Sequence, residues 1–128
     1  MKKILTVFML VFFISSIFQA CNKDEYGPND IRIHNVSPYT YTNVHVDTSE
    51  GTNDYGTINS GVTTEYVRFK QAFNKADITL MIDGVQYSTE PVNFTALVPL
   101  VKSKLTFEVD VDTVSRIISM EISEILPL

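Results

Sequence analysis

The chain has 128 residues, enough for one ordinary domain, and its 15 acidic side chains outnumber its 10 basic ones to give a net charge of −5. The basic residues are scattered along the chain, so the composition excludes the clustered phosphate-binding surface that nucleic-acid partners need. Only one cysteine is present, which excludes a disulfide within the chain.

The first 20 residues have the layout of a secretory signal peptide. Lys2 and Lys3 form a positively charged start, an apolar run from Ile4 to Phe18 follows, and Ala20 is the small residue at the predicted cleavage point. A transmembrane helix needs about 20 apolar residues, and this run is shorter and lacks a basic flank. We therefore expect residues 1 to 20 to be a signal-peptide helix that is removed, leaving 108 residues with a net charge of −7.

The single cysteine, Cys21, ends the stretch Phe18-Gln19-Ala20-Cys21. This stretch resembles the lipobox of bacterial lipoproteins, with phenylalanine where that motif usually has leucine. The resemblance implies that Cys21 is acylated on its sulfur atom. The residues that follow, Lys23, Asp24 and Glu25, resemble the export signal of Bacteroidota surface lipoproteins. An ordinary secreted protein with an accidental first cysteine is the alternative.

Acylation at Cys21 has consequences for location and chemistry. Each buried CH₂ contributes about 0.8 kcal/mol, so two or three acyl chains make membrane attachment durable. An acylated cysteine is no longer a nucleophile. The resemblance therefore implies an outer-membrane lipoprotein that faces the cell surface, with the periplasmic face as the alternative. Residues 21 to 30, which include Gly27 and Pro28, are expected to form a flexible tether ahead of the folded domain.

Beyond residue 30 the sequence predicts short strands. Ile31 to His34 and Asn43 to Asp47 alternate apolar and polar side chains, and we predict that they form an antiparallel pair. Thr48 to Gly56 is rich in turn-forming residues and is predicted to be a loop. Tyr55 to Ile58 and Val62 to Phe69 are predicted to be the next strands.

The clearest local signal is Asp83-Gly84 between two alternating runs. It predicts a two-residue type I′ hairpin, because both central residues of that turn need positive φ. The resulting register pairs Ile82 with Val85 and Leu80 with Tyr87. All four side chains then lie on the core face.

The longest strict alternation runs from Leu105 to Asp112, with apolar residues at the odd positions and polar residues at the even ones. This pattern predicts a strand with one buried and one solvated face. Arg116 to Ser123 is predicted to be the last strand and its neighbour, since the connection between them is short.

Seven or eight short strands in about 100 residues predict an all-β domain. We expect an antiparallel, immunoglobulin-like two-sheet sandwich over residues 31 to 128, with a small barrel as the alternative.

Two groups of residues offer metal ligands. His34 and His45 lie on the two strands predicted to pair, but two histidines without a third ligand make a weak site, and we prefer exposed strand histidines. Asp47, Glu50 and Asp54 offer oxygen ligands for Ca²⁺, but their spacing does not match an EF-hand, and we prefer a solvated loop. We assign no metal and no cofactor.

Catalytic signals are weak. Glu108, Asp110 and Asp112 project from one strand face, whereas glycosidases usually bring two carboxylates together from separate elements. No G-x-S-x-G elbow and no glycine-rich phosphate loop occurs, and neither histidine has a marked acid partner in the sequence. We therefore assign no catalytic residue and expect no enzyme.

Tyrosines are frequent near the predicted loops of the first half, where they could serve a binding surface or complete the core. They are Tyr26, Tyr39, Tyr41 and Tyr55. Separately, Asp112-Thr113-Val114 resembles the O-glycosylation motif of exported Bacteroidota proteins, which implies a glycan on Thr113.

The body of the chain, over residues 31 to 124, is similar to a set of small Bacteroidota lipoproteins of unknown function. The likeness rests on Tyr55 to Tyr66, on Pro91 to Phe94, and on Pro99-Leu100 with the lysines after it. It implies a fold and no activity.

Taken together, the sequence predicts a non-catalytic binding or accessory module whose partner is an envelope protein, a glycan or a host molecule. The alternatives are a structural subunit of an envelope complex that uses an edge strand for β-augmentation and, least favoured, a small hydrolase.

Overall fold

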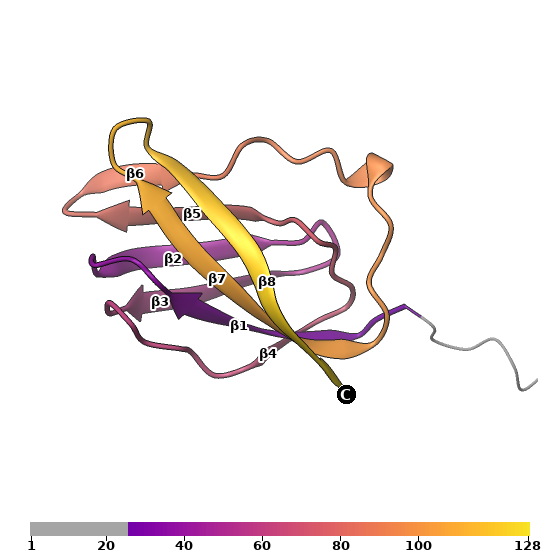
Figure 1. Ribbon diagram of the computed structural model, residues 1–128. Helices are drawn as coiled ribbons and strands as arrows, with labels where there is room; N and C mark the ends of the chain where they lie inside the picture. The colour runs from indigo at the N-terminus through magenta and orange to yellow at the C-terminus, as the bar shows by residue number, and fades with distance from the viewer. Residues whose placement is uncertain (1–25) are drawn as a thin grey trace, which may run out of the picture.

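The computed structural model describes residues 26–128 (Figure 1). The predicted signal peptide, Cys21 and the Lys23-Asp24-Glu25 signal lie outside the described residues. The described part contains eight strands and one short 3₁₀ helix. They are β1 (Asn29–Asn35), β2 (Tyr41–Asp47), β3 (Thr52–Ile58), β4 (Val67–Phe69), β5 (Asp77–Ile82), β6 (Val85–Ser88), η2 (Phe94–Ala96), β7 (Ser103–Asp112) and β8 (Ile117–Pro127).

The strands form one mixed sheet in the order β3-β2-β5-β6-β8-β7-β1-β4. The β1–β7 and β6–β8 pairs are parallel, and the other pairs are antiparallel. A single residue pair, Ser88 with Ile117, joins the two four-stranded halves. In Figure 1, β7 and β8 cross in front of the half that contains β5 and β2. The all-β prediction is confirmed, but the prediction of a purely antiparallel arrangement is wrong, because β1–β7 and β6–β8 run parallel. The sheet is nearly barrel-like, curving back on itself.

The core lies between the two halves. It is built from the inward side chains of every long strand, among them Ile33, Val46, Leu80 and Phe107, all 0–1% exposed. The Tyr41 hydroxyl on β2 donates to the Val109 carbonyl on β7 at 2.9 Å, so the two halves are in direct contact. Between residues 26 and 128, no helix is long and apolar enough to cross a membrane.

Two asparagines on β1 also connect distant segments, and both are fully buried. The Asn35 amide donates to the Tyr39 and Ile58 carbonyls at 2.7 and 3.0 Å. At the other end of β1, Asn29 donates to the Val101 carbonyl at 2.8 Å and accepts from the Ala72 N–H at 2.9 Å. Buried amides are stable only when their donors and acceptors are satisfied, so these two fix how β1 sits in the sheet.

The hairpin prediction is confirmed in detail. Asp83 and Gly84 have φ of +50° and +77°, and the ladder pairs Ile82 with Val85 and Leu80 with Tyr87. The apolar face of β7 is also confirmed, because Leu105, Phe107 and Val109 are all 0% exposed, and β8 is its antiparallel neighbour. The opposite face is only partly solvated, since Thr106 is 5% exposed.

The predicted pairing of the first two strands is wrong. β1 pairs with β7 and β4, whereas β2 pairs with β3 and β5. The chain crosses from one half to the other between them, where Asn35 accepts hydrogen bonds from the N–H and hydroxyl of Ser37 at 2.9 and 2.8 Å. These side-chain bonds supply the turn geometry of a crossover in place of a hairpin.

Three segment boundaries also differ from the predictions. Most of the expected loop Thr48 to Gly56 belongs to β3, an edge strand whose polar residues face solvent. Of the expected strand Val62 to Phe69, only Val67–Phe69 forms β4, with a separate bridge between Thr63 and His34. β1 begins at Asn29, and Tyr26 already bridges Val101, so the fold reaches into the expected tether.

Candidate functional site

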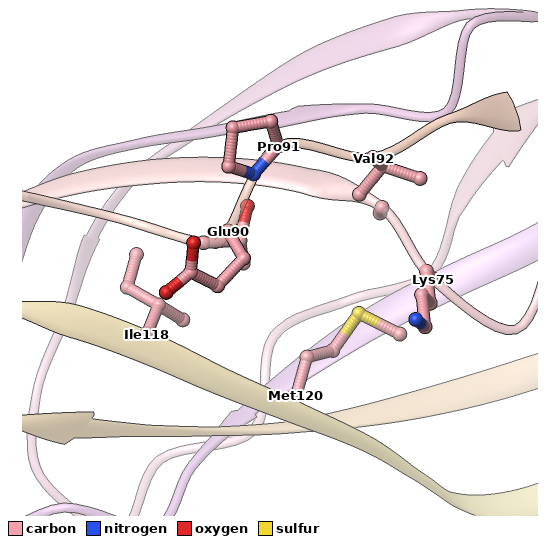
Figure 2. A pocket seen from close by; sticks show the side chains of 8 residues that line it. Lys75, Glu90, Pro91, Val92, Ile118 and Met120 are labelled. Atoms are coloured by element: carbon pink, nitrogen blue, oxygen red, sulfur yellow. The ribbon is translucent and has the colours of Figure 1, made fainter.

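The main hollow of interest is a groove that runs beside β8, which we call the β8 groove. It is a cavity of about 170 Å³ between β8 and the segments that flank β5 and β6 (Figure 2). Its lining residues are Lys75, Ala76, Thr89, Glu90, Pro91, Val92, Ile118 and Met120. Figure 2 shows Ile118 and Met120 reaching from β8 toward the segment that carries Glu90, Pro91 and Val92.

The groove exists because β6 ends early. The Thr89 N–H donates to the Ile78 carbonyl, and the Thr89 hydroxyl accepts from the Ile78 N–H, each at 3.0 Å. Both bonds turn Thr89 toward β5 and away from β8. Pro91 then lacks the N–H that a continued ladder would need. The chain leaves β8 after Ser88, and Figure 1 shows the two diverging.

The groove has an apolar floor and a polar rim. Ala76 and Ile118 are buried at 2% and 3% exposure, whereas Lys75 and Glu90 are exposed at the rim. Small-molecule pockets usually span roughly 300–1,000 Å³. At about 170 Å³, the β8 groove is large enough for side chains of a partner and too small to enclose a cofactor.

The outer surface of the β7–β8 ladder carries a cluster of carboxylates, which we call the acidic face: Glu108, Asp110 and Glu121. Glu108 lies directly across from Glu121, and Asp110 across from Ser119. Together with Val36 they line a shallow hollow of about 210 Å³. Two of the predicted carboxylates, Glu108 and Asp110, therefore lie together on an open surface.

The third predicted carboxylate, Asp112, lies apart at the turn between β7 and β8. It accepts hydrogen bonds from the N–H groups of Val114 and Ser115 at 2.9 and 3.3 Å. These bonds, that from Val114 above all, lower the pKa of Asp112. Asp112 thus shapes the turn that exposes Thr113, the residue of the glycosylation motif.

The two histidines lie in different halves of the sheet, so the hypothesis of a shared metal is wrong. The His34 Nδ1 atom is 3.8 Å from a Glu108 oxygen, and the His45 Nδ1 atom is 2.6 Å from an Asp54 oxygen. Each histidine therefore has an acid partner, which the sequence reading did not find because both partners come from other strands.

The three carboxylates considered for Ca²⁺ also point to separate partners. Asp54 is paired with His45, Asp47 accepts from the Ser49 N–H at 2.6 Å, and a Glu50 oxygen is 3.7 Å from the Lys70 ammonium. Within the described part of the chain, no group of three or more His, Cys, Asp or Glu side chains is placed to hold a metal ion.

The tyrosines divide between core and surface. Tyr41 is 0% exposed, and its burial raises the pKa of the phenol to about 12. Tyr55 donates to the Ile31 carbonyl at 2.8 Å, and burial raises its pKa as well. Tyr26 and Tyr39 are exposed at 48% and 38%, so only these two are available to a partner.

The groove was not foreseen from the sequence. Ile118 and Met120 belong to the predicted last strand, Arg116 to Ser123, but Lys75, Ala76 and the Thr89 to Val92 segment carried no recognisable signal. These segments are far apart in the chain, and only the strand order brings them together.

This geometry defines the class of protein: a small all-β domain with an open groove beside one strand and an acidic face on the adjoining ladder. No family model and no curated protein matches the chain. Among solved structures, it is similar to one described as "NMR structure of the protein from Eubacterium rectale", at 16% identity and a TM-score of 0.47 over 80% of this chain and 95% of that chain.

Proposed function

We propose that this protein is a lipid-anchored outer-membrane module that binds a partner at the cell surface and has no catalytic role. The observation that carries the binding part is the β8 groove, whose floor is apolar and whose size suits side chains of a partner. The anchoring part rests on the lipobox-like stretch that ends at Cys21. The partner classes are an envelope protein, a glycan or a host molecule.

The anchor is tested by replacing Cys21 with alanine. We expect the wild-type chain to incorporate a clickable palmitate analogue and to fractionate with membranes, and the C21A chain to do neither. Equal labelling of the two chains would contradict acylation at this residue. A Thr113→Ala variant, far from the anchor in sequence, is the matched control and should label normally.

The surface location is tested separately. Replacing Lys23, Asp24 and Glu25 with alanine should leave palmitate labelling intact but protect the protein from protease added to whole cells. Protection of the wild-type chain would place it on the periplasmic face instead.

A second candidate function is a structural subunit of an envelope complex, joined through an edge strand. The observation that favours it is the length of β8, 11 residues, of which only Ile117 pairs with a strand of residues 26–128 on the side away from β7. Affinity purification from cross-linked cells distinguishes the two: a subunit is recovered in a fixed ratio with the same proteins at every growth stage, and a binding module is not.

We also propose a glycan on Thr113, which is exposed at the β7–β8 turn. Mass spectrometry of protein from the native host should show a mass increment that disappears in Thr113→Ala and persists in Ser115→Ala.

For the fold, we infer an immunoglobulin-like sandwich in which β3-β2-β5-β6 and β8-β7-β1-β4 are the two layers. The single Ser88–Ile117 pair supports this, since its Ser88 N–H to Arg116 carbonyl bond is long, at 3.4 Å. The Ser88 amide should then exchange with solvent much faster than the Leu80 amide. Equal protection would favour one closed sheet.

A further inference from the structure

We propose that the β8 groove and the open edge of β8 together bind an extended peptide strand in which apolar residues alternate with basic ones. This inference rests on the proposed binding function and names the chemistry of the partner. Three features of the described residues support it: the backbone edge, the apolar floor and the acidic face.

The backbone edge comes first. On the side of β8 that faces β6, the Arg116 carbonyl accepts from Ser88, and beyond Ile117 that side has no strand partner among residues 26–128. An edge of this kind presents a row of unpaired N–H and C=O groups, which is a template for another strand. The partner must therefore offer main-chain hydrogen bonds, and an extended peptide does so.

The groove determines one face of the added strand. Ile118 and Met120 point inward from β8, and Val92 lies on the opposite wall. Side chains of a strand alternate between its two faces, so every second residue of the peptide would point into this groove. Those residues should be apolar, because burial of apolar surface against Ile118, Met120 and Val92 is the favourable term available there.

The acidic face determines the other face of the strand. Glu121 and Ser119 point outward from β8, next to Glu108 and Asp110 on β7. Outward residues of an added strand would lie directly beside Ser119 and Glu121. Opposite charges at such cross-strand positions are stabilising and like charges are not, so these residues should be lysine or arginine.

The negative charges of the acidic face argue against a second copy of this chain as the partner that pairs with β8. Two copies paired through β8 would place two acidic faces side by side, in a domain that already carries excess negative charge. A basic strand would neutralise that face, whereas a second copy would double it.

The test uses the anchor-free chain from Asn22 to Leu128, whose whole core lies between residues 31 and 118. The probes are three pools of ten-residue peptides: apolar residues alternating with lysine, the same residues in scrambled order, and apolar residues alternating with glutamate. We expect the lysine-alternating pool to bind at least tenfold more tightly than either other pool and to protect amides of β8 from hydrogen exchange.

Variants locate the site. Glu121→Lys should weaken binding of the lysine-alternating pool at least tenfold, whereas Glu65→Lys, the same charge change at an exposed position outside the two hollows, should not. Val92→Asp should also weaken binding, because it places a charge in the groove. Methylating the backbone nitrogens of one alternate set of peptide residues should abolish binding, and methylating the other set should be tolerated.

Three results would overturn the inference. One is equal affinity for the alternating and scrambled pools, which would mean attraction by charge alone. Another is no binding of the alternating pool at millimolar concentration. The third is a dimer by ultracentrifugation with β8 amides protected in the absence of peptide, which would assign the edge to a second copy. Because the assay omits Cys21, none of these outcomes depends on the lipid anchor.

Discussion

The most informative single substitution is Asn35→Ala, because this buried side chain joins β1 to the opposite half of the sheet. Its amide donates to the Tyr39 and Ile58 carbonyls, and its oxygen accepts from the N–H and hydroxyl of Ser37. Alanine removes all four hydrogen bonds and leaves their partners in place.

The expected loss of stability depends on which of these partners keep another hydrogen bond. The Tyr39 carbonyl also accepts from the Ser37 hydroxyl at 3.3 Å, so it stays satisfied. The Ile58 carbonyl and the Ser37 N–H lose their partner at a site where Asn35 is 0% exposed. A buried polar group without a partner costs about 1–3 kcal/mol, so we expect a loss of about 3 kcal/mol in the free energy of unfolding. For a domain of this size, that is a decrease in Tm of roughly 15 °C.

Urea denaturation monitored by circular dichroism at pH 7 measures this loss. Asn74→Ala is the matched control, since the side chain of Asn74 is exposed, and it should change the free energy of unfolding by less than about 0.5 kcal/mol. A loss below about 1 kcal/mol for Asn35→Ala would refute the reasoning. It would mean that water or a shift of the backbone provides new hydrogen bonds to the Ile58 carbonyl and the Ser37 N–H.

The other predictions concern the backbone, the core and pH. Gly27→Ala should destabilise the fold more than Gly61→Ala: both glycines have positive φ, but a Cβ atom on Gly27 would collide with the Lys70 carbonyl oxygen, whereas one on Gly61 meets open space. Thermal melts of the two variants compare them directly. Phe107→Ala should cost about 3–5 kcal/mol in urea titrations, because it empties a fully buried position. The pKa of Tyr41 is raised to about 12 in the fold, against 10.0 for the free side chain. The stability that the protonated phenol contributes is therefore present below pH 10 and is lost as the pH rises toward 12. Tyr41→Phe should reduce this loss of stability at alkaline pH.

Local features of the fold were predictable, because their signals lie in adjacent residues. Asp83-Gly84 specifies its own turn, and that turn sets the register of β5 and β6. The strict alternation from Leu105 to Asp112 identifies a half-buried strand without any knowledge of its neighbours. In both cases the physical cause and the sequence pattern occupy the same stretch of chain.

The strand order was not predictable in the same way. The parallel β1–β7 pair joins residues more than 70 positions apart, such as Asn29 with Ser103, and no periodicity in either segment reports it. The first residues of β3, Thr52 to Asp54, were mistaken for a loop because an edge strand with polar, solvent-facing residues has the composition of a loop, whereas Tyr55 to Ile58 were correctly predicted to be a strand. Asn29 and Asn35 gave no signal either, since burial of an amide depends on partners that only the fold supplies.

The candidate site shows the same division. Two carboxylates of the acidic face, Glu108 and Asp110, were recognised from the sequence as members of one strand face. Glu121 lies beside them only because of the β7–β8 register, which the sequence does not report. The groove depends on where β6 stops, and Pro91 was used at the level of sequence only in the likeness to other lipoproteins. A proline shortly after a short strand is a signal that could have located this opening.

The parallel pairing of β1 with β7 also sets when the domain can fold. Its first strand lies between β4 and β7, and β7 begins at Ser103, so β1 stays without one of its two neighbours until synthesis has passed residue 103. Contacts at such separation form slowly, because a long loop must close first. We therefore expect a nascent chain to remain unfolded at least until β7 has been synthesised.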